Sequence, residues 1–377
     1  MQIIFWLSLI ILFYTYLGYP LLLWVLSKLF SKPVNKGNFL PDVSLIIVGH
    51  NEGRYIKDKI DNILALDYPK EKLEIIIGSD CSDDRTNSIV KEYKSGKVKL
   101  FVSDERKGKI SLINRIVPQA KGGIIVFSDV RQKLKSDALR QLAANFNDTS
   151  VGCVSGELLY LNEDKNVASC GVGLYWRYEK FMRKLESSLG SMIGATGAIY
   201  ALRKSLFVAP SEDTILDDVA IPLYVVARGY RAVFDESAKA YEAAAESSKE
   251  EFGRKARTLA GNFQLFSRYR KSLASFKAIF LWKFLSHKFL RAVAFIFLLA
   301  LVIASFFLKH IYPYNFGFLA QTVFYLFAVS GFTAEKLRIS SRFLSVPYMF
   351  CVLNLAAVQG FLRFILKKQK VTWEKVV

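Results

Sequence analysis

The sequence predicts an α/β domain built on an open, mainly parallel β-sheet, with membrane-spanning helices at both ends of the chain. Two observations predict this plan. Between residues 40 and 270, short apolar runs that end in polar residues alternate with segments of helical periodicity. Residues 1–30 and 289–377 instead contain long apolar segments. The alternation is typical of strand–helix–strand units, and the long segments are typical of transmembrane helices.

The strands are expected where apolar runs are short and continuous, as in a parallel sheet that is buried on both faces. Four runs fit: Val43–Val48, Leu73–Gly78, Val98–Val102 and Ile124–Phe127. Helical spacing of Ile56, Ile60 and Ile63 predicts a helix after the first strand, and another is expected over about 84–93. Ser136 is expected to cap the helix that follows the fourth strand.

The N-terminal segment Met1–Ser27 has no charged side chain and is long enough to cross the hydrocarbon core of a membrane, which is roughly 30 Å thick. It has no basic start and no small-residue cleavage site, which favours an uncleaved anchor over a signal peptide. Three more apolar segments lie near the C-terminus: Phe289–Leu308, Phe316–Ala334 and Phe343–Leu366.

The distribution of lysines predicts the orientation. Lys28, Lys32 and Lys36 follow the first span, so the positive-inside rule places the α/β domain in the cytoplasm of a multi-pass plasma-membrane protein. If all four segments cross, the basic tail after residue 366 ends outside, against the same rule. Either the last segment, which contains Pro347, is re-entrant or interfacial, or the tail breaks the rule.

The expected domains are therefore an anchor at 1–30, the α/β domain at 40–270, an amphipathic helix at 271–288 and a membrane region with a short basic tail at 289–377. The amphipathic helix is inferred because Leu273, Phe276, Ile279, Phe280 and Phe284 share one helical face. This pattern suits a helix lying on the membrane surface, and packing against a neighbouring subunit is the alternative.

The formal net charge of +19 favours an anionic partner. No recognised nucleic-acid motif accompanies it, so anionic lipid headgroups or a phosphorylated substrate are the simpler partners. The four cysteines are scattered, without a CxxC pair, which suits a reducing compartment.

Polar clusters follow each predicted strand: "GHNEG", "SDCSDD", "DERKGK" and "SDVR". In open α/β sheets ligands bind at the carboxyl ends of the strands, so these clusters predict one site. Carboxylates with lysines and arginines suit a ligand that carries both sugar hydroxyls and phosphates. No GxGxxG or GxxxxGK[ST] sequence follows a strand, which argues against a dinucleotide site or a P-loop.

These clusters, with "RKGKISLIN" and "ILDDVAIPL", resemble the family 2 inverting glycosyltransferases of GT-A fold (Rossmann-like), in particular the membrane-bound polysaccharide synthases for cellulose, hyaluronan and poly-N-acetylglucosamine. The resemblance covers nearly the whole chain. It implies a nucleotide-sugar donor, most simply UDP-linked. It also implies nucleotide-sugar contacts at Asn51, Glu52, Asp80, Lys109 and Asp129.

The resemblance also implies that Asp218 is the general base, since it falls on the last residue of the family's T-E-D motif, with Asp217 in place of the glutamate. Inversion at the anomeric carbon needs a carboxylate that takes a proton from the acceptor hydroxyl. The alternative role for Asp218 is a carboxylate that stabilises a helix N-terminus. "IGATGAIYALRKSLF" resembles the glycine-rich strand of the acceptor site and implies acceptor contacts at Gly194, Thr196 and Gly197, beside Asp217.

One departure from the family concerns the D-x-D motif, which here ends in Arg131 instead of a metal-binding carboxylate. Arg131 could supply part of the metal's charge at the diphosphate. Alternatively, Arg131 pairs with a neighbouring carboxylate, and Asp129 alone holds Mg²⁺ or Mn²⁺ together with water and phosphate, which is the expectation adopted here.

A second departure lies in "FGRKARTLAGNFQ", where the processive synthases carry Q-x-x-R-W. Arg254 and Arg257 are expected at the diphosphate. Thr258 stands where the family has a sugar-stacking tryptophan, which puts processivity in question.

The expected activity is sugar transfer to a growing extracellular or capsular polysaccharide. Single transfer to a polyprenyl-phosphate or glycolipid acceptor is the alternative, and an inactive homologue that acts as an assembly scaffold is the alternative of another class. Expected partners are the UDP-sugar, membrane lipids and a glycan or lipid-linked acceptor, with no nucleic acid. A homo-oligomer or export partners are compatible with the sequence.

Overall fold

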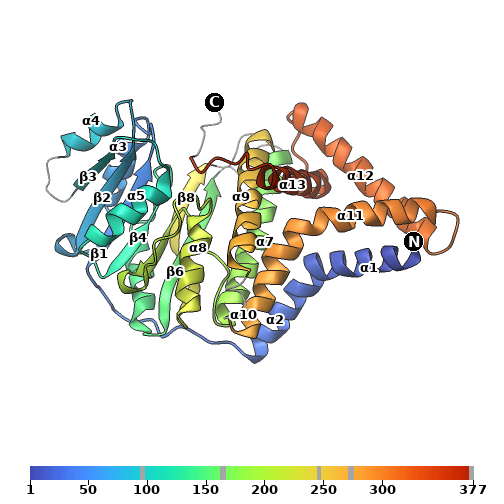
Figure 1. Cartoon of the computed structure of the whole chain (residues 1–377), viewed down its shortest axis with the longest axis horizontal. Coiled ribbons are helices and arrows are strands. Elements are labelled where there is room, and N and C mark those ends of the chain that lie inside the picture. Colours follow the sequence, from blue (N-terminus) through green and yellow to red (C-terminus); the bar gives the residue numbers. More distant parts are fainter. Residues whose placement is uncertain (94–97, 162–166, 244–247, 271–275, 373–377) are drawn as a thin grey trace. The chain divides into compact units, whose positions relative to one another are not determined.

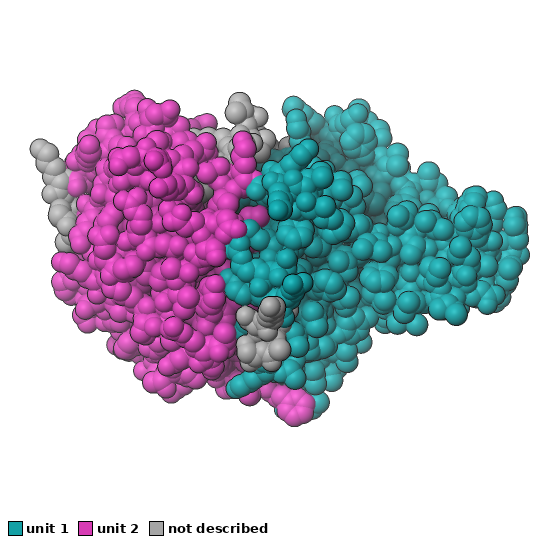
Figure 2. Space-filling model, viewed as in Figure 1, with its two compact units in different colours: residues 1–29, 160–182, 243–369 teal, residues 30–159, 183–242, 370–377 magenta. Residues whose placement is uncertain are grey.

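The structure of the chain is a computed structural model that describes residues 1–93, 98–161, 167–243, 248–270 and 276–372 (Figure 1). These residues form two compact units (Figure 2). The sheet unit comprises Phe30–Leu159, Arg183–Glu242 and Lys370–Val377. The helical unit comprises Met1–Leu29, Tyr160–Met182 and Ala243–Gln369. Each unit is described by itself.

The sheet unit is built on an eight-stranded mixed sheet in the order β3-β2-β1-β4-β7-β6-β8-β5. The strands are β1 Val43–Gly49, β2 Leu73–Asp80, β3 Val98–Ser103, β4 Ile124–Phe127, β5 Lys133–Leu134, β6 Val151–Leu161, β7 Tyr200–Arg203 and β8 Arg231–Ala243. Strands β3, β2, β1 and β4 are parallel to one another, whereas β7 pairs antiparallel with both β4 and β6, and β5 pairs antiparallel with β8.

All four strands expected from apolar runs are present, and they form the parallel half of the sheet. Every residue of β1 and β4 is buried, because helices cover the sheet and no face of these strands meets water. The helices of this unit are α3 Ile56–Leu64, α4 Thr86–Glu92, α5 Lys109–Ile116, α6 Ala138–Ala144 and α8 Asp217–Ala227. The expected cap of α6 is wrong by one residue, because Asp137 and not Ser136 occupies the N-cap.

The segment that resembles a glycine-rich strand is strand only at Tyr200–Arg203, so the expectation of a strand over the acceptor residues is wrong. Gly194, Thr196 and Gly197 lie in the loop that precedes β7. The backbone N–H of Ala195 donates to the carbonyl of Asp218 at 2.8 Å, which holds this loop against the start of α8 instead of in the sheet. The core behind it joins Ile46, Phe127, Tyr200 and Ile221 from β1, β4, β7 and α8.

Among its described residues, the helical unit contains four helices that are long and apolar enough to cross a membrane: Gln2–Leu29, Ala278–Phe307, Tyr314–Lys336 and Arg342–Ile365. The first consists of α1 Gln2–Phe13, the π-helical turn η1 Tyr14–Gly18 and α2 Tyr19–Leu29. The second consists of α10 Ala278–Phe284, η7 Leu285–Phe289 and α11 Leu290–Phe307. The others are α12 and α13. One N-terminal and three C-terminal helices of this length and composition were expected, and the structure contains them in the described residues.

Contacts between helices hold this unit together. Helix α1 lies beside α11, where Phe5, Leu12, Leu301 and Tyr314 form an apolar cluster (Figure 1). Helix α13 packs against α9 Ser248–Tyr269 and α12. The unit also includes the first part of α7 Val167–Ser188.

The expected interfacial helix at 271–288 falls in part outside the described residues, since 271–275 are not described. From Ala278 onward the chain is helical and continues without a break into α11. The last apolar segment forms one continuous helix, α13, with Pro347 in its second turn, and is therefore not a re-entrant loop.

Candidate active site

An ammonium group between two carboxylates forms the centre of the candidate site in the sheet unit. The Nζ atom of Lys109 lies 2.8 Å from Oδ1 of Asp129 and 3.1 Å from Oδ2 of Asp217. Lys109 and Asp217 are largely buried, whereas 41% of the Asp129 side chain is exposed. The arrangement therefore presents a carboxylate to solvent while a buried cation holds it in place.

The fold brings these three residues together from distant parts of the sequence. Asp129 lies two residues beyond the end of β4, and Lys109 is the first residue of α5, after Gly108. Gly108 has a φ of 92°, a left-handed conformation that glycine adopts without a steric cost. Asp217 and Asp218 form the first turn of α8. The site thus occupies the carboxyl edge of the parallel strands, as expected for an open α/β sheet.

Lys109 stays charged in this setting. Burial by itself lowers the pKa of its ammonium. The nearby carboxylates of Asp129 and Asp217, with a smaller contribution from Asp218, outweigh burial and raise that pKa well above the usual range. Burial and the same two aspartates of α8 raise the pKa of Tyr200, so its hydroxyl stays protonated and donates to Asp217 at 3.3 Å.

Gly197 closes the site from the loop before β7. A Cβ atom at this position would lie 3.3 Å from Oδ2 of Asp129, 3.8 Å from Oδ2 of Asp218 and 3.9 Å from Nζ of Lys109. The carboxylate of Asp218 therefore reaches the same small volume as the other two charged groups. Thr196 is buried, and its N–H donates to Ser155 Oγ at 3.1 Å. Gly194 packs against Val219.

Two predicted donor-side residues hold the loops at the carboxyl edge. The carboxylate of Asp80, which is 1% exposed, accepts hydrogen bonds from the backbone N–H groups of Lys107 (3.0 Å) and Gly108 (2.9 Å). This positions the start of α5 and hence Lys109. The side-chain amide of Asn51, a residue with a φ of 55°, donates to Asp83 Oδ1 at 2.6 Å and accepts from the backbone N–H of Asp83 at 3.0 Å.

Arg131 and Asp129 have different ion-pair partners: Arg131 pairs with Glu52, and Asp129 pairs with Lys109. Strand β4 ends at Phe127, so Asp129 and Arg131 do not share one face of a strand. The guanidinium of Arg131 lies 3.5 Å from Oε1 of the buried Glu52 and 5.2 Å from the ring centroid of Tyr55. The ion pair to a neighbouring carboxylate, one of the two alternatives for Arg131, is present.

Sequence reasoning missed Lys59, which is buried at the edge of the site. Its Nζ donates to Ser128 Oγ and to the Gln132 carbonyl, both at 2.7 Å. Burial lowers the pKa of Lys59 to about 7, although Asp129 acts in the opposite direction. A neutral amine has two N–H donors, and both are used here. The signal was present in the sequence, because Lys59 follows Ile56 by three residues and precedes Ile63 by four, on the apolar face of α3.

The donor set for a divalent cation at Asp129 is small. Among the residues that the structure describes, no group of three His, Cys, Asp or Glu side chains is placed to hold a metal ion. Oδ1 of Asp129 accepts a hydrogen bond from the ammonium group of Lys109, and Oδ2 faces Gly197. This fits Mg²⁺ or Mn²⁺ bound through one carboxylate oxygen, with the remaining positions filled by water and a substrate diphosphate.

Arg254 and Arg257 belong to the helical unit, on α9. Arg254 forms an ion pair with Glu250 at 2.5 Å, one turn earlier on the helix. The hydroxyl of Thr258 donates to the carbonyl of Arg254 at 3.0 Å. The roles of both arginines at the diphosphate remain predictions.

Comparisons with known proteins identify a matching family model, curated relatives and a solved structure of similar fold. The model of a family described as glycosyltransferase-like family 2 matches residues 41–261. Poly-beta-1,6-N-acetyl-D-glucosamine synthase of Staphylococcus aureus (strain COL) is 26% identical over 210 residues, 54% of this chain and 50% of that protein. The probable glycosyltransferase YdaM of Bacillus subtilis (strain 168) is 27% identical over 233 residues, 59% of this chain and 56% of that protein. The chain spans about half the length of the curated relatives that it matches.

Among solved structures, the mannosyltransferase PcManGT from Pyrobaculum calidifontis, in complex with GDP-Man and Mn²⁺, superposes with a TM-score of 0.73 at 20% identity. The match covers 96% of this chain and 99% of that one. With the family match, this likeness confirms the predicted fold.

Proposed function

Because the chain belongs to glycosyltransferase family 2, we propose that it is an inverting enzyme that transfers a sugar from a UDP-sugar to a growing extracellular or capsular polysaccharide, with Asp218 as general base. The family match confirms the predicted enzyme class, a glycosyltransferase. The observation that carries the proposal is the meeting of Lys109, Asp129 and the aspartates of α8 at the carboxyl edge of the sheet.

The geometry suits an inverting displacement. The carboxylate of Asp218 accepts the proton of the acceptor hydroxyl as that oxygen attacks the anomeric carbon, and the bond to the diphosphate breaks on the opposite side. Lys109 stays charged, and it holds Asp129 and Asp217 in place. Gly197 has no side chain, so its backbone stands close to the carboxylates of Asp129 and Asp218, and Gly194 and Thr196 belong to the same loop beside the base.

A divalent cation belongs to the proposal. Asp129 would hold Mg²⁺ or Mn²⁺ through its exposed carboxylate, and the ion, when bound, stabilises the departing diphosphate. The structurally similar mannosyltransferase was solved in complex with GDP-Man and Mn²⁺, which supports this part. That protein binds GDP-Man, so the uridine nucleotide needs its own test.

The membrane helices support a location in the plasma membrane, with the sheet unit in the cytoplasm and lipids around the four candidate spans. The curated relative in Staphylococcus aureus is a polysaccharide synthase by name, which supports a polymer product. The same proposal places the end of the α/β domain at residue 270, before the amphipathic helix and the C-terminal membrane region.

Single transfer to a polyprenyl-phosphate or glycolipid acceptor is the second candidate. The observation that favours it is Thr258, because the hydroxyl of this residue bonds to its own helix and offers no ring on which a sugar of a growing chain could stack.

The test is release of nucleoside diphosphate by the full chain, purified and reconstituted in lipid, against a panel of UDP- and GDP-sugars with lipid and glycan acceptors. Turnover with a UDP-sugar and a product of many sugars is the expected result. A product one sugar long would establish the second candidate. Absence of turnover with every donor and acceptor would favour the third alternative, an inactive homologue that acts as an assembly scaffold.

A further inference from the structure

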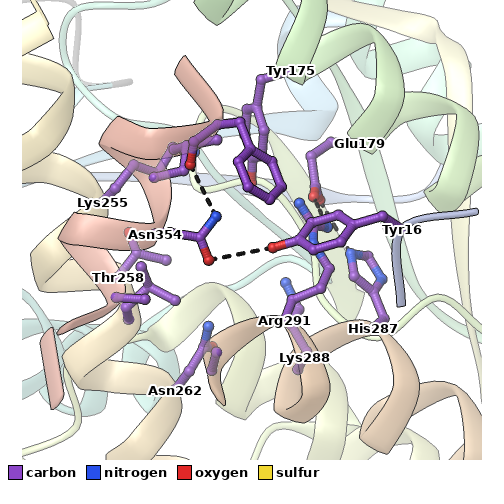
Figure 3. A pocket seen from close by; sticks show the side chains of 15 residues that line it. Tyr16, Tyr175, Glu179, Lys255, Thr258, Asn262, His287, Lys288, Arg291 and Asn354 are labelled. Atoms are coloured by element: carbon purple, nitrogen blue, oxygen red, sulfur yellow. Dashed lines mark hydrogen bonds and ion pairs between the residues drawn. The ribbon is translucent and has the colours of Figure 1, made fainter. Parts of the chain in front are cut away.

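A cavity of about 100 Å³ lies within the helical unit, lined by candidate membrane helices and by α7 and α9 (Figure 3). Three of the four candidate membrane helices contribute polar side chains to it. Tyr16 comes from the first, Lys288 and Arg291 from the second, and Asn354 from the last. Helices α7 and α9 add Glu179 and Lys255.

The polar contributions lie near the middle of their helices rather than at the ends. Tyr16 is central in Gln2–Leu29, Arg291 in Ala278–Phe307 and Asn354 in Arg342–Ile365. Ionisable side chains at the middle of membrane helices are energetically costly and are found where a function uses them. Their convergence on a single cavity therefore points to a polar ligand.

The charge around the cavity is positive. Lys255, Lys288 and Arg291 line it together with one carboxylate, Glu179, which Arg291 and His287 engage. Lys255 also lies 3.5 Å from the buried Glu251. Among the charged side chains that line the cavity, three are cations and one is a carboxylate, so the lining suits an anionic ligand.

The partners of Lys255 keep it charged. Its Nζ lies 4.0 Å from the centroid of the Tyr175 ring and 4.9 Å from that of Trp176. Burial by itself lowers the pKa of Lys255, and the effects of Tyr175 and the two glutamates outweigh burial and raise it. A lysine ammonium group that is fixed in position in this way is a strong hydrogen-bond donor to phosphate oxygens.

Hydrogen-bonding groups and apolar side chains both line the cavity. The Tyr16 hydroxyl donates to Asn354 Oδ1 at 3.4 Å, and Asn354 donates to the Phe350 carbonyl at 2.9 Å (Figure 3). Leu259, Phe350 and Leu353 complete the lining with carbon atoms. The volume suits a single phosphate group better than a stretch of polymer.

We propose that this cavity binds the phosphate group of a membrane lipid, with Lys255, Lys288 and Arg291 around the phosphate oxygens and the lipid tail along the apolar lining. A free phosphate would match the charges but not the apolar lining residues or the position midway along the membrane helices. The inference stands on the cavity alone and does not depend on the proposed sugar transfer.

The test measures binding of dioleoyl phosphatidic acid to the full chain in a maltoside detergent, without nucleotide sugar. Dioleoylglycerol, which lacks the phosphate, and inorganic phosphate are the comparison ligands. Lys288→Gln and Lys255→Gln are each expected to weaken binding of phosphatidic acid about tenfold, because a charge-assisted bond to phosphate is lost. The exposed Lys277, which precedes α10 and lies outside the cavity lining, provides the control Lys277→Gln with the same loss of charge.

Equal binding of phosphatidic acid and dioleoylglycerol would overturn the proposal, as would equal effects of the cavity variants and of Lys277→Gln. Binding of inorganic phosphate with the same affinity and the same dependence on Lys288 would identify a free-anion site instead. A neutral oligosaccharide is added as a further competitor. If it displaces the lipid and binds equally to all variants, the cavity binds a glycan and the proposal is wrong. Melting temperatures close to that of the unsubstituted chain establish that the variants are folded.

Discussion

Arg131 and Glu52 form an ion pair across 3.5 Å, between an arginine that is 41% exposed and a carboxylate that is almost wholly buried. Among the described residues, none donates a hydrogen bond to Oε2 of Glu52. The residue that replaces the second carboxylate of the metal motif therefore has a partner of its own within the protein. Asp129 is then the carboxylate of that motif that remains for binding a metal ion.

Arg131→Met should lower stability more than it changes the metal requirement. Removing the arginine leaves a buried carboxylate without its cation, at a cost of about 1–3 kcal/mol, so the melting temperature should fall. The double variant Arg131→Met/Glu52→Gln should recover much of that loss, because the buried charge is then gone. Turnover of the unsubstituted chain and of the variant should cease in EDTA and return with Mn²⁺ or Mg²⁺.

The opposite pattern would assign Arg131 to the diphosphate. In that case turnover of the unsubstituted chain survives EDTA, and Arg131→Met raises the KM for the donor with no change in melting temperature. Both readouts come from one preparation.

Asp218→Asn should reduce turnover by about 10²–10⁴-fold and leave donor binding unchanged, because an amide cannot accept the proton of the acceptor hydroxyl. Donor affinity is measured separately by calorimetry. The control is Asp67→Asn, an exposed aspartate that precedes β2, at the opposite edge of the strands from the site.

The alternative for Asp218 is stabilisation of the α8 N-terminus, where Asp217 stands beside it. That role predicts a loss of melting temperature from Asp218→Asn and only a small loss of turnover. A variant that melts early and still turns over would remove Asp218 as the base.

The parallel half of the sheet was predictable because its strands are continuous apolar runs, and β1 and β4 begin at the expected residues. The meeting of Lys109 with Asp129 followed from the rule that strand ends gather at one edge. The antiparallel strands β6, β7 and β8 were not assigned, since buried and partly exposed residues are mixed in β8 and the run in β7 is four residues long. The Arg131–Glu52 pair depends on where β4 ends, which local sequence does not determine.

Gly197→Ala should lower turnover about tenfold with little loss of stability. The added Cβ atom would stand 3.3 Å from Asp129 Oδ2, so the carboxylate must shift by a few tenths of an ångström, and displacements at reacting groups are costly. Gly123→Ala is the matched control, because a Cβ atom there meets nothing within 4 Å. Equal activity of the two variants would show that the loop before β7 does not shape the site.

The stability of the chain should rise between pH 7 and pH 9 through Lys59. Its pKa is about 7 in the folded protein and about 10.4 in an unfolded chain, so the unfolded state binds more protons across this interval. The free energy of unfolding then increases with pH, by roughly 1–3 kcal/mol over the two units for this one group. Below pH 7 the folded protein carries the full cost of a buried ammonium.

Lys59→Met isolates this effect. The methionine removes the titrating group and keeps an unbranched side chain on the apolar face of α3, so the pH-dependent rise in melting temperature between pH 7 and pH 9 should be smaller than in the unsubstituted chain. Lys57→Met, on the same helix but exposed, should keep the full rise. An identical pH profile for Lys59→Met and the unsubstituted chain would mean that Lys59 is charged throughout, held by Asp129 in spite of its burial.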